Sequence, residues 1–212
     1  KGTSNCTQRC CGGVIVPPQG YWERVQEICR KYDILLHIDE VVCGLGRTGK
    51  VLAEEHEGIE ADLTLIGKAL SGGFYPISAV LSNKEVMDVL RPGEHGSTFG
   101  GNPLACAIAR TALRVLIEEN MIENAAKMGD YFLSNLSKIR SPHIKEVRGK
   151  GLFIGVEVQN NNAMQYCRRL LELGLIVNDS HGHTIRISPP LNISDEELDY
   201  MMTRLEKLLL DH

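Results

Sequence analysis

The fold of this chain is decided by the stretch Leu63-Thr64-Leu65-Ile66-Gly67-Lys68-Ala69-Leu70-Ser71-Gly72-Gly73. It predicts a short apolar strand that ends at a lysine and is followed by a glycine-rich turn. A second predicted strand, Ile34 to Ile38, is almost continuously apolar and ends at Asp39. Runs of this kind are typical of strands buried on both faces of a parallel sheet. In such α/β sheets ligands gather at the carboxyl ends of the strands, so we expect Lys68 and Asp39 to share one site.

A lysine and an acid placed in this way suit a pyridoxal-phosphate site. The lysine amine can bind the cofactor aldehyde covalently, and the carboxylate can keep the pyridine nitrogen protonated. A single lysine is usually a solvated surface residue, but Lys68 lies between an apolar strand and Ala69-Leu70. Such surroundings favour the neutral amine, which is the form that attacks a carbonyl. For Asp39 and Glu40, surface acids or a helix cap remain the alternative interpretation.

Composition limits the classes of protein. The chain has 212 residues, of which 43% are hydrophobic, and a net charge of −4, which is ordinary for one large or two small globular domains. The mild negative charge gives no reason to expect nucleic acid or a membrane surface as a partner. Charged residues interrupt every apolar run, and the polar start, Lys1 to Cys11, predicts no secretory signal.

The seven cysteines predict a reducing compartment and no disulfide framework, because their number is odd and several lie within apolar patterns. Cys6, Cys10 and Cys11 lie close together, but no histidine or second cysteine pair stands at ligand spacing. We therefore expect free thiols and no metal.

The order of elements predicts two packed parts. Strands alternate with helices up to about residue 120, and a compact α+β segment follows. We therefore expect residues 1–12 to match no element, residues 13–120 to form a large domain and residues 121–212 to form a small one. Further strands are expected over 13–16, 76–81, 144–147, 152–158 and 184–188, with a turn at 148–151. Helices are expected over 21–31, 84–90, 104–119, 122–139, 164–173 and from Ser194 onward, with Asn120 as a break or cap, Gly174 as a stop and Ser194 as the cap of the last helix.

The stretch Gly44 to Gly49 spells G-x-G-x-x-G, the dinucleotide-binding pattern. That pattern requires glycines directly after a strand and at the opening of a helix. Here four residues separate Asp39 from Gly44, and Lys50 to Gly58 is a weak, charged helix at best, so we do not expect a dinucleotide site.

Two other stretches carry groups that bind anions. Ser97-Thr98, in a glycine-rich loop, could donate hydroxyl and backbone N–H groups to a phosphate, or could form a tight turn before the helix near Pro103. Arg186 lies in a predicted strand and could grip a substrate carboxylate with its fork of donors, or could extend to solvent. His181 and His183 flank a glycine and are expected in solvent.

Taken together, these stretches resemble the class III (subgroup II) pyridoxal-phosphate aminotransferases, and within them most closely the branch that acts on ornithine. The order and spacing of the family hold from about Gly13 to the C-terminus. The matching stretches are 39–41, 44–49, 66–73, 93–105, 147–152 and 181–191.

The resemblance implies a fold-type I transferase, with a partial large domain that has a parallel-type sheet and a small α+β domain. It implies that Lys68 binds the cofactor, that Asp39 pairs with the pyridinium nitrogen and that Val41 packs on the ring face. Ser97 and Thr98 would reach the phosphate of the cofactor in a partner subunit, which implies a homodimer. Arg186 would hold the α-carboxylate of the substrate.

The reaction implied by the resemblance moves the δ-amino group of ornithine to 2-oxoglutarate and yields glutamate semialdehyde and glutamate. Acetylornithine and 4-aminobutyrate aminotransferases are the alternatives within the family. The resemblance suggests the mitochondrial matrix as location, with the cytosol as alternative.

Two features depart from the family. The family has a glutamine that hydrogen-bonds the phenolic oxygen of the cofactor where this chain has Val42, and losing that bond should cost about 1–3 kcal/mol of site energy. It also has a glutamate near Cys11 that partners the arginine corresponding to Arg186. Because the match begins about halfway along the family's length, we expect a truncated chain, and a non-catalytic remnant that binds full-length subunits is the alternative to an enzyme.

Overall fold

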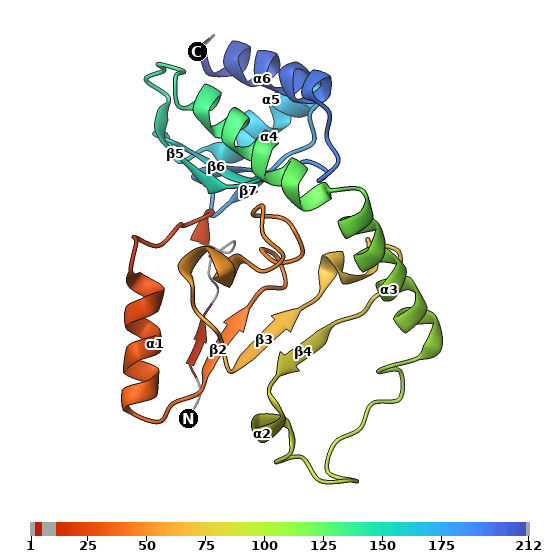
Figure 1. The fold of residues 1–212 in the computed structure, drawn as a ribbon. Coiled ribbons are helices and arrows are strands. Elements are labelled where there is room, and N and C mark those ends of the chain that lie inside the picture. Colours follow the sequence, from red (N-terminus) through yellow and green to blue (C-terminus); the bar gives the residue numbers. More distant parts are fainter. Residues whose placement is uncertain (1–2, 6–11, 211–212) are drawn as a thin grey trace. The chain divides into compact units, whose positions relative to one another are not determined.

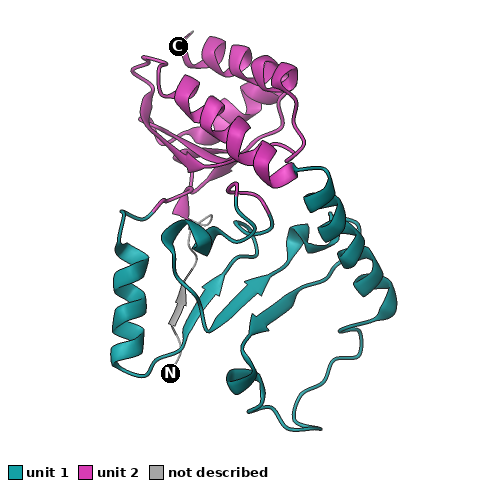
Figure 2. Cartoon of the chain, in the orientation of Figure 1, with its two compact units in different colours: residues 1–7, 17–45, 50–120 teal, residues 8–16, 46–49, 121–212 magenta. Residues whose placement is uncertain are grey.

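The computed structural model describes residues 3–5 and 12–210, and it divides into two compact units (Figures 1 and 2). Unit 1 comprises residues 1–7, 17–45 and 50–120, and unit 2 comprises residues 8–16, 46–49 and 121–212. The domain boundaries expected from the sequence, at 12 and 120, stay a prediction.

Unit 1 is built on a four-stranded sheet in the order β1-β2-β3-β4. The strands β1 (Thr3–Asn5), β2 (Leu36–Asp39) and β3 (Leu63–Ile66) are parallel, and β4 (Ala79–Ser82) runs antiparallel to β3. The expected α/β class is therefore confirmed, with a mixed sheet in place of a purely parallel one.

The N-terminal segment differs from expectation in two places. Residues 3–5 form β1 although their sequence, Thr-Ser-Asn, has no apolar pattern, because pairing of the backbone with β2 is enough to make an edge strand. The strand expected over 13–16 is reduced to a single bridge residue, Ile15, since Gly13 and Val14 have left-handed φ values of 94° and 58°. Cys6, Cys10 and Cys11 lie outside the described residues.

The helix α1 (Tyr21–Lys31) covers one face of this sheet, with the bounds expected from its apolar spacing. Trp22 and Cys29 pack with Leu36 and Ile38 of β2 and with Ile59 in a small core. The other helical elements of unit 1 are η2 (Ala53–Glu57), η3 (Lys68–Ser71), α2 (Lys84–Met87) and α3 (Pro103–Glu118).

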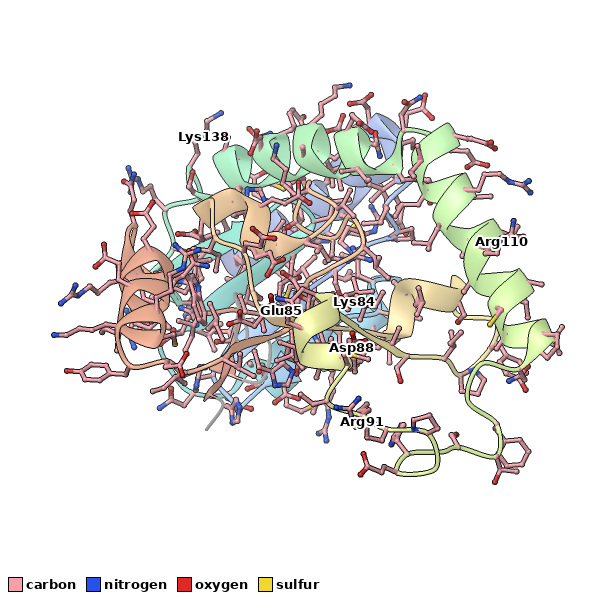
Figure 3. The ribbon with its side chains drawn as sticks, turned by 60° about the horizontal axis from the view of Figure 1, so that its bottom comes forward. Lys84, Glu85, Asp88, Arg91, Arg110 and Lys138 are labelled. Atoms are coloured by element: carbon pink, nitrogen blue, oxygen red, sulfur yellow. The ribbon has the colours of Figure 1, made fainter. Side chains whose placement is uncertain are left out.

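The region around α2 is polar and solvated. Lys84 and Asp88 form an exposed i,i+4 ion pair at 3.9 Å, and Glu85 and Arg91 also extend outward (Figure 3). Exposed pairs of this kind contribute little stability. The segment from Met87 to Gly101 is exposed throughout.

Unit 2 is an antiparallel sheet in the order β5-β6-β8-β7, covered on one face by helices. Its core is the larger of the two and includes Phe132, Leu136, Leu152, Ile154, Ile185, Ile187 and Leu205, all essentially inaccessible to solvent. The elements are α4 (Met121–Leu136), β5 (Ile144–Lys150), β6 (Phe153–Val158), α5 (Ala163–Glu172), β7 (Asn178–Ser180), β8 (Thr184–Ile187) and α6 (Asp195–Leu210).

The expected helix breaks and caps are confirmed. Asn120 has a left-handed φ of 51° between α3 and α4, and Gly174, with φ of 86°, follows α5. Ser194 and Glu197 form a reciprocal capping box at the start of α6. The turn expected over 148–151 is shorter in the structure. The strand β5 continues to Lys150, which pairs with Phe153, so that Gly151 and Leu152 alone connect β5 to β6. The short strand β7 was not expected.

Within residues 3–5 and 12–210, no helix has the length and apolar character that crossing a membrane requires. The same residues contain no cluster of three or more His, Cys, Asp or Glu side chains placed to hold a metal ion.

Candidate functional site

Asp39 and Lys68 come from the carboxyl ends of neighbouring parallel strands. Asp39, the last residue of β2, pairs with Leu65 of β3, and the next backbone N–H, of Glu40, donates to the Leu65 carbonyl at 2.9 Å. Lys68 begins the 3-10 turn that follows β3. The strand arrangement expected from the sequence is thus present.

The Asp39 carboxylate is held in place by the backbone. Its Oδ1 accepts a hydrogen bond from the Val41 N–H at 2.9 Å, as in an Asx turn. Among the described residues Oδ2 accepts no hydrogen bond, so it can accept one from a ligand. The side chain of Cys43 donates to the Asp39 carbonyl at 3.6 Å and ties the following turn to the strand end.

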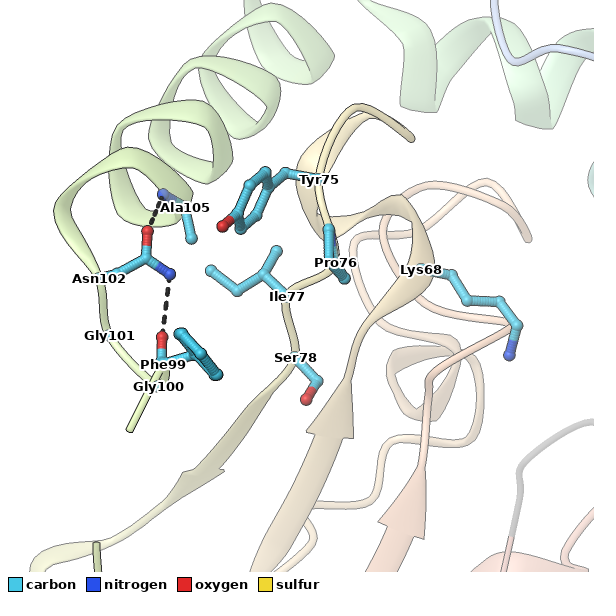
Figure 4. A pocket seen from close by; sticks show the side chains of 10 residues that line it. All are labelled: Lys68, Tyr75, Pro76, Ile77, Ser78, Phe99, Gly100, Gly101, Asn102 and Ala105. Carbon is cyan, nitrogen blue, oxygen red and sulfur yellow. Dashed lines mark hydrogen bonds between the residues drawn. The ribbon is translucent and has the colours of Figure 1, made fainter. Parts of the chain in front are cut away.

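The turn that carries Lys68 packs against the turn that carries Val41. A Cβ placed on the buried Gly67 would lie 3.4 Å from Val41 Cγ1 and 3.5 Å from Ser78 Cβ, so the backbone passes between these side chains. Lys68 itself has a left-handed φ of 40° and is exposed, in contrast to the enclosed setting expected from its apolar neighbours in sequence. The reason is that the turn directs its side chain out of the strand layer (Figure 4).

A pocket of about 500 Å³ lies beside this turn, between the segment after η3 and the loop before α3. Lys68 is among the lining residues, with Tyr75, Ile77, Phe99 and Asn102, although the end of its side chain points away from these four (Figure 4). Asn102 caps α3, because its Oδ1 accepts from the Ala105 N–H at 2.9 Å.

Ser97 and Thr98 lie in the exposed loop before α3, and neither lines this pocket. Ser97 Oγ accepts a hydrogen bond from the Gly100 N–H at 2.9 Å, which is the tight-turn arrangement weighed from the sequence. The Ser97 hydroxyl therefore keeps its O–H as a hydrogen-bond donor, and this donor and the Thr98 hydroxyl are available to bind an anion.

Arg186 belongs to unit 2, where it lies in the middle of β8. Its neighbours Ile185 and Ile187 are fully buried in the core, so Arg186 projects from the opposite face of the sheet. Within the described part of the chain its guanidinium makes no hydrogen bond or ion pair. It borders a cavity of about 220 Å³ together with Ile176, Asn178 and Ser188. A half-buried guanidinium of this kind suits a carboxylate ligand.

The stretch Gly44 to Gly49 is a packing loop, since no helix begins within it. Its residues 46–49 belong to unit 2, where a Cβ on Gly49 would lie 2.8 Å from Ala126 Cβ on α4. Arg47, for which no role was expected, donates from Nη1 to the carbonyls of Leu152 and Pro189. Burial lowers the pKa of Arg47 to about 10. Its place in the glycine-rich loop Gly44 to Gly49 carried no signal of this role.

Two further acids were not expected to be buried. Glu40 and Glu54 are 1% and 8% exposed, and the Glu54 N–H donates to Glu40 Oε1 at 2.9 Å. Thr64 Oγ1 donates to the Glu54 carboxylate at 3.5 Å. Burial and the negative charge of Glu40 raise the pKa of Glu54 to about 7.

Comparison with known proteins agrees with these features. The family model described as aminotransferase class-III matches residues 9–209. An ornithine aminotransferase of Bordetella pertussis is 55% identical over 199 residues, which are 93% of this chain and 48% of that protein. The chain therefore spans about half the length of the curated relatives it matches.

Solved structures give the same result. One is an ornithine aminotransferase from Toxoplasma gondii, described with partial occupancy of PLP at its active site. It has a TM-score of 0.93 at 43% identity, and the match covers 98% of this chain and 50% of that protein. An acetylornithine aminotransferase from Elizabethkingia anophelis has a TM-score of 0.94 at 42% identity, and the match covers 99% of this chain and 56% of that protein.

Proposed function

Because this chain belongs to the class-III aminotransferase family, we propose that it is the lysine-bearing part of a pyridoxal-phosphate-dependent transaminase. The observation that carries the proposal is the placement of Asp39 and Lys68 at the ends of two neighbouring parallel strands. An acid with a free oxygen, an amine and the apolar side chain of Val41 near the lysine turn are the groups that a pyridoxal ring requires.

When bound, the cofactor supplies an electron sink for bonds at the carbon that bears the substrate amine. Lys68 Nζ would bind the cofactor aldehyde and, once released, would carry a proton to and from the substrate carbon. Asp39 Oδ2 would hold the proton on the ring nitrogen, and Val41 would supply an apolar contact for the ring.

Ornithine is the amino donor we propose, with 2-oxoglutarate as acceptor and glutamate 5-semialdehyde and glutamate as products. The name of the Bordetella relative supports this choice at 55% identity. Arg186 would bind the α-carboxylate of the substrate, so that the distal amine is left to react. Acetylornithine is the second candidate, because the Elizabethkingia structure matches the same residues at a TM-score of 0.94.

We further propose that the chain assembles with a second subunit. The exposed loop with Ser97 and Thr98 would contact the cofactor phosphate of that subunit, consistent with the lack of either residue in the pocket beside Lys68. Location in the mitochondrial matrix or in the cytosol stays a prediction from the resemblance.

Chemical trapping tests the site. The chain is incubated with pyridoxal phosphate, the lysine linkage is reduced with borohydride, and peptides are identified by mass spectrometry. We expect the cofactor mass mainly on Lys68, and Lys68→Ala should remove it, whereas Lys84→Ala, an exposed lysine on α2, should not. Equal modification of Lys68 and Lys84 would contradict the proposal, because it would indicate unspecific reaction with surface amines.

The donor is tested separately. A complex of this chain with a full-length subunit is given ornithine or acetylornithine together with 2-oxoglutarate, and glutamate formation is measured. If glutamate forms faster with acetylornithine, acetylornithine is the donor in place of ornithine. If the chain does not associate with the full-length subunit, the proposed assembly is contradicted.

A further inference from the structure

Four residues form one rung across the sheet of unit 2. Arg148 on β5 pairs with Gly155 on β6, which pairs with Arg186 on β8, which in turn pairs with Asn178 on β7. Directly paired residues of antiparallel strands project to the same face. Arg148 and Arg186 therefore stand on one face, two strands apart, with the side-chain-free Gly155 between them.

The space above Gly155 is filled by the segment Gly12–Val16, which belongs to unit 2. A Cβ placed on Gly155 would lie 3.0 Å from Val14 Cβ and 3.2 Å from the Gly13 carbonyl oxygen. Gly13 and Val14 are buried. A side chain at position 155 would therefore crowd this segment, which lies on the face of the sheet from which Arg186 also projects.

Arg148 fixes the segment in this position. Its Nε donates to the carbonyls of Gly13 and Val14 at 3.0 and 3.2 Å, and its Nη2 donates to the Gly13 carbonyl at 2.8 Å. Nη2 also donates to Thr184 Oγ1 at 3.2 Å. Gly13 has a φ of 94°, which residues with a side chain rarely adopt, and a Cβ there would lie 2.8 Å from Thr184 Oγ1 and 3.2 Å from Arg148 Nη2.

The charge of Arg148 is balanced within unit 2. Its Nη1 contacts Glu146 at 2.6 Å and Glu157 at 2.5 Å, and the side chains of Arg148 and Glu157 are only 12% and 13% exposed. All three nitrogens of the guanidinium are thus engaged. Arg186, on the same rung, has no such partner among the residues described here. The two arginines therefore differ in what they can do: one is saturated and the other can bind an anion.

We propose that Arg148 is a positioning residue that holds Gly12–Val16 over Gly155 as one wall of the carboxylate site at Arg186. The inference rests on the proposed role of Arg186 as the carboxylate-binding residue. Without the clamp, the segment would leave the face of β6, and the guanidinium of Arg186 would lose the wall that limits its rotamers and excludes water.

The test uses glutarate, an unreactive dicarboxylate, as a probe of Arg186, and measures its Kd by calorimetry. Hydrogen exchange of the peptides that contain residues 12–16 is measured on the same samples. Arg148→Gln removes the positive charge and the hydrogen bonds to Gly13 and Val14, which we call the clamp, whereas Arg148→Lys keeps the charge. Gly155→Ala displaces the segment without altering Arg148. Lys145→Gln is the matched control, because Lys145 contacts Glu157 at 2.5 Å but not Gly13.

We expect Arg148→Gln and Gly155→Ala to speed exchange at 12–16 and to raise the Kd of glutarate about tenfold. Arg148→Lys should recover part of the affinity, and Lys145→Gln should leave both readouts unchanged. Faster exchange with an unchanged Kd would overturn the positioning role, and unchanged exchange would overturn the clamp. If the unaltered chain does not bind glutarate, the role of Arg186 fails and the positioning role with it, while exchange still decides whether the clamp exists.

Discussion

Gly129 in α4 and Gly151 in the turn between β5 and β6 meet backbone to backbone: a Cβ on Gly129 would lie 2.2 Å from the Gly151 carbonyl carbon. Gly151 in turn lies against Thr48, with only 2.4 Å from its virtual Cβ to the Thr48 carbonyl carbon. The loop 46–49 and the hairpin turn can therefore stack on α4 only because these positions lack side chains.

Gly129→Ala tests this packing. An alanine inside a helix normally stabilises it by about 1 kcal/mol relative to glycine. Here we expect the opposite sign, a loss of about 2 kcal/mol or more, because the methyl group would collide with backbone atoms that cannot move aside cheaply. Urea unfolding measures the change. Ser134→Ala, on the exposed face of the same helix, is the control and should change stability by less than about 0.5 kcal/mol.

The Glu40–Glu54 pair makes stability depend on pH. Since burial and the charge of Glu40 raise the pKa of Glu54 to about 7 from 4.5, the folded state holds a proton that the unfolded state releases. This contribution is complete below pH 4.5 and is lost as pH rises through about 7. We expect the loss to be on the order of 2–3 kcal/mol. The free energy of unfolding, measured for Glu54→Gln between these pH values, should not show this loss. The control variant Glu60→Gln, at an exposed position, should show the same loss as the unaltered chain.

Val42→Gln would restore a hydrogen-bond donor where the resemblance expects one. If the chain binds pyridoxal phosphate as proposed, the amide should strengthen binding by about 1 kcal/mol, or about fivefold in Kd. Equilibrium dialysis measures this, and Val42→Leu, which adds bulk without a donor, is the control. An equal gain from both variants would attribute the effect to packing.

Ser194→Ala tests the capping box of α6. The Ser194 hydroxyl accepts the Glu197 N–H at 3.2 Å, and the Glu197 carboxylate accepts the Ser194 N–H at 2.9 Å. We expect the variant to lower the free energy of unfolding by about 1 kcal/mol, because one N-terminal N–H loses its partner. Thr203→Ala, in the same helix but away from its end, should have a smaller effect. Equal losses would show that the cap contributes nothing special.

The sequence was most informative where local patterns act alone. The apolar spacing of α1, the helix break at Asn120 and the Ser194 cap depend on neighbours a few residues away, and all three are found as expected. The strand β1 could not be read in this way, because three polar residues become a strand only through pairing with β2. The buried environments of Arg47 and Glu54 were missed for the same reason, since their partners lie up to 142 positions away.

By itself, the sequence determined that a lysine and an acid end two apolar strands, because alternation, glycine turns and charge are local properties of the chain. Only the tertiary structure decided that β2 and β3 are neighbours, and that Arg148 is saturated while Arg186, on the same rung, keeps its donors free among the described residues. Burial and hydrogen-bond partners depend on segments far apart in the chain, so no local pattern of residue types can distinguish two arginines that differ only in what surrounds them.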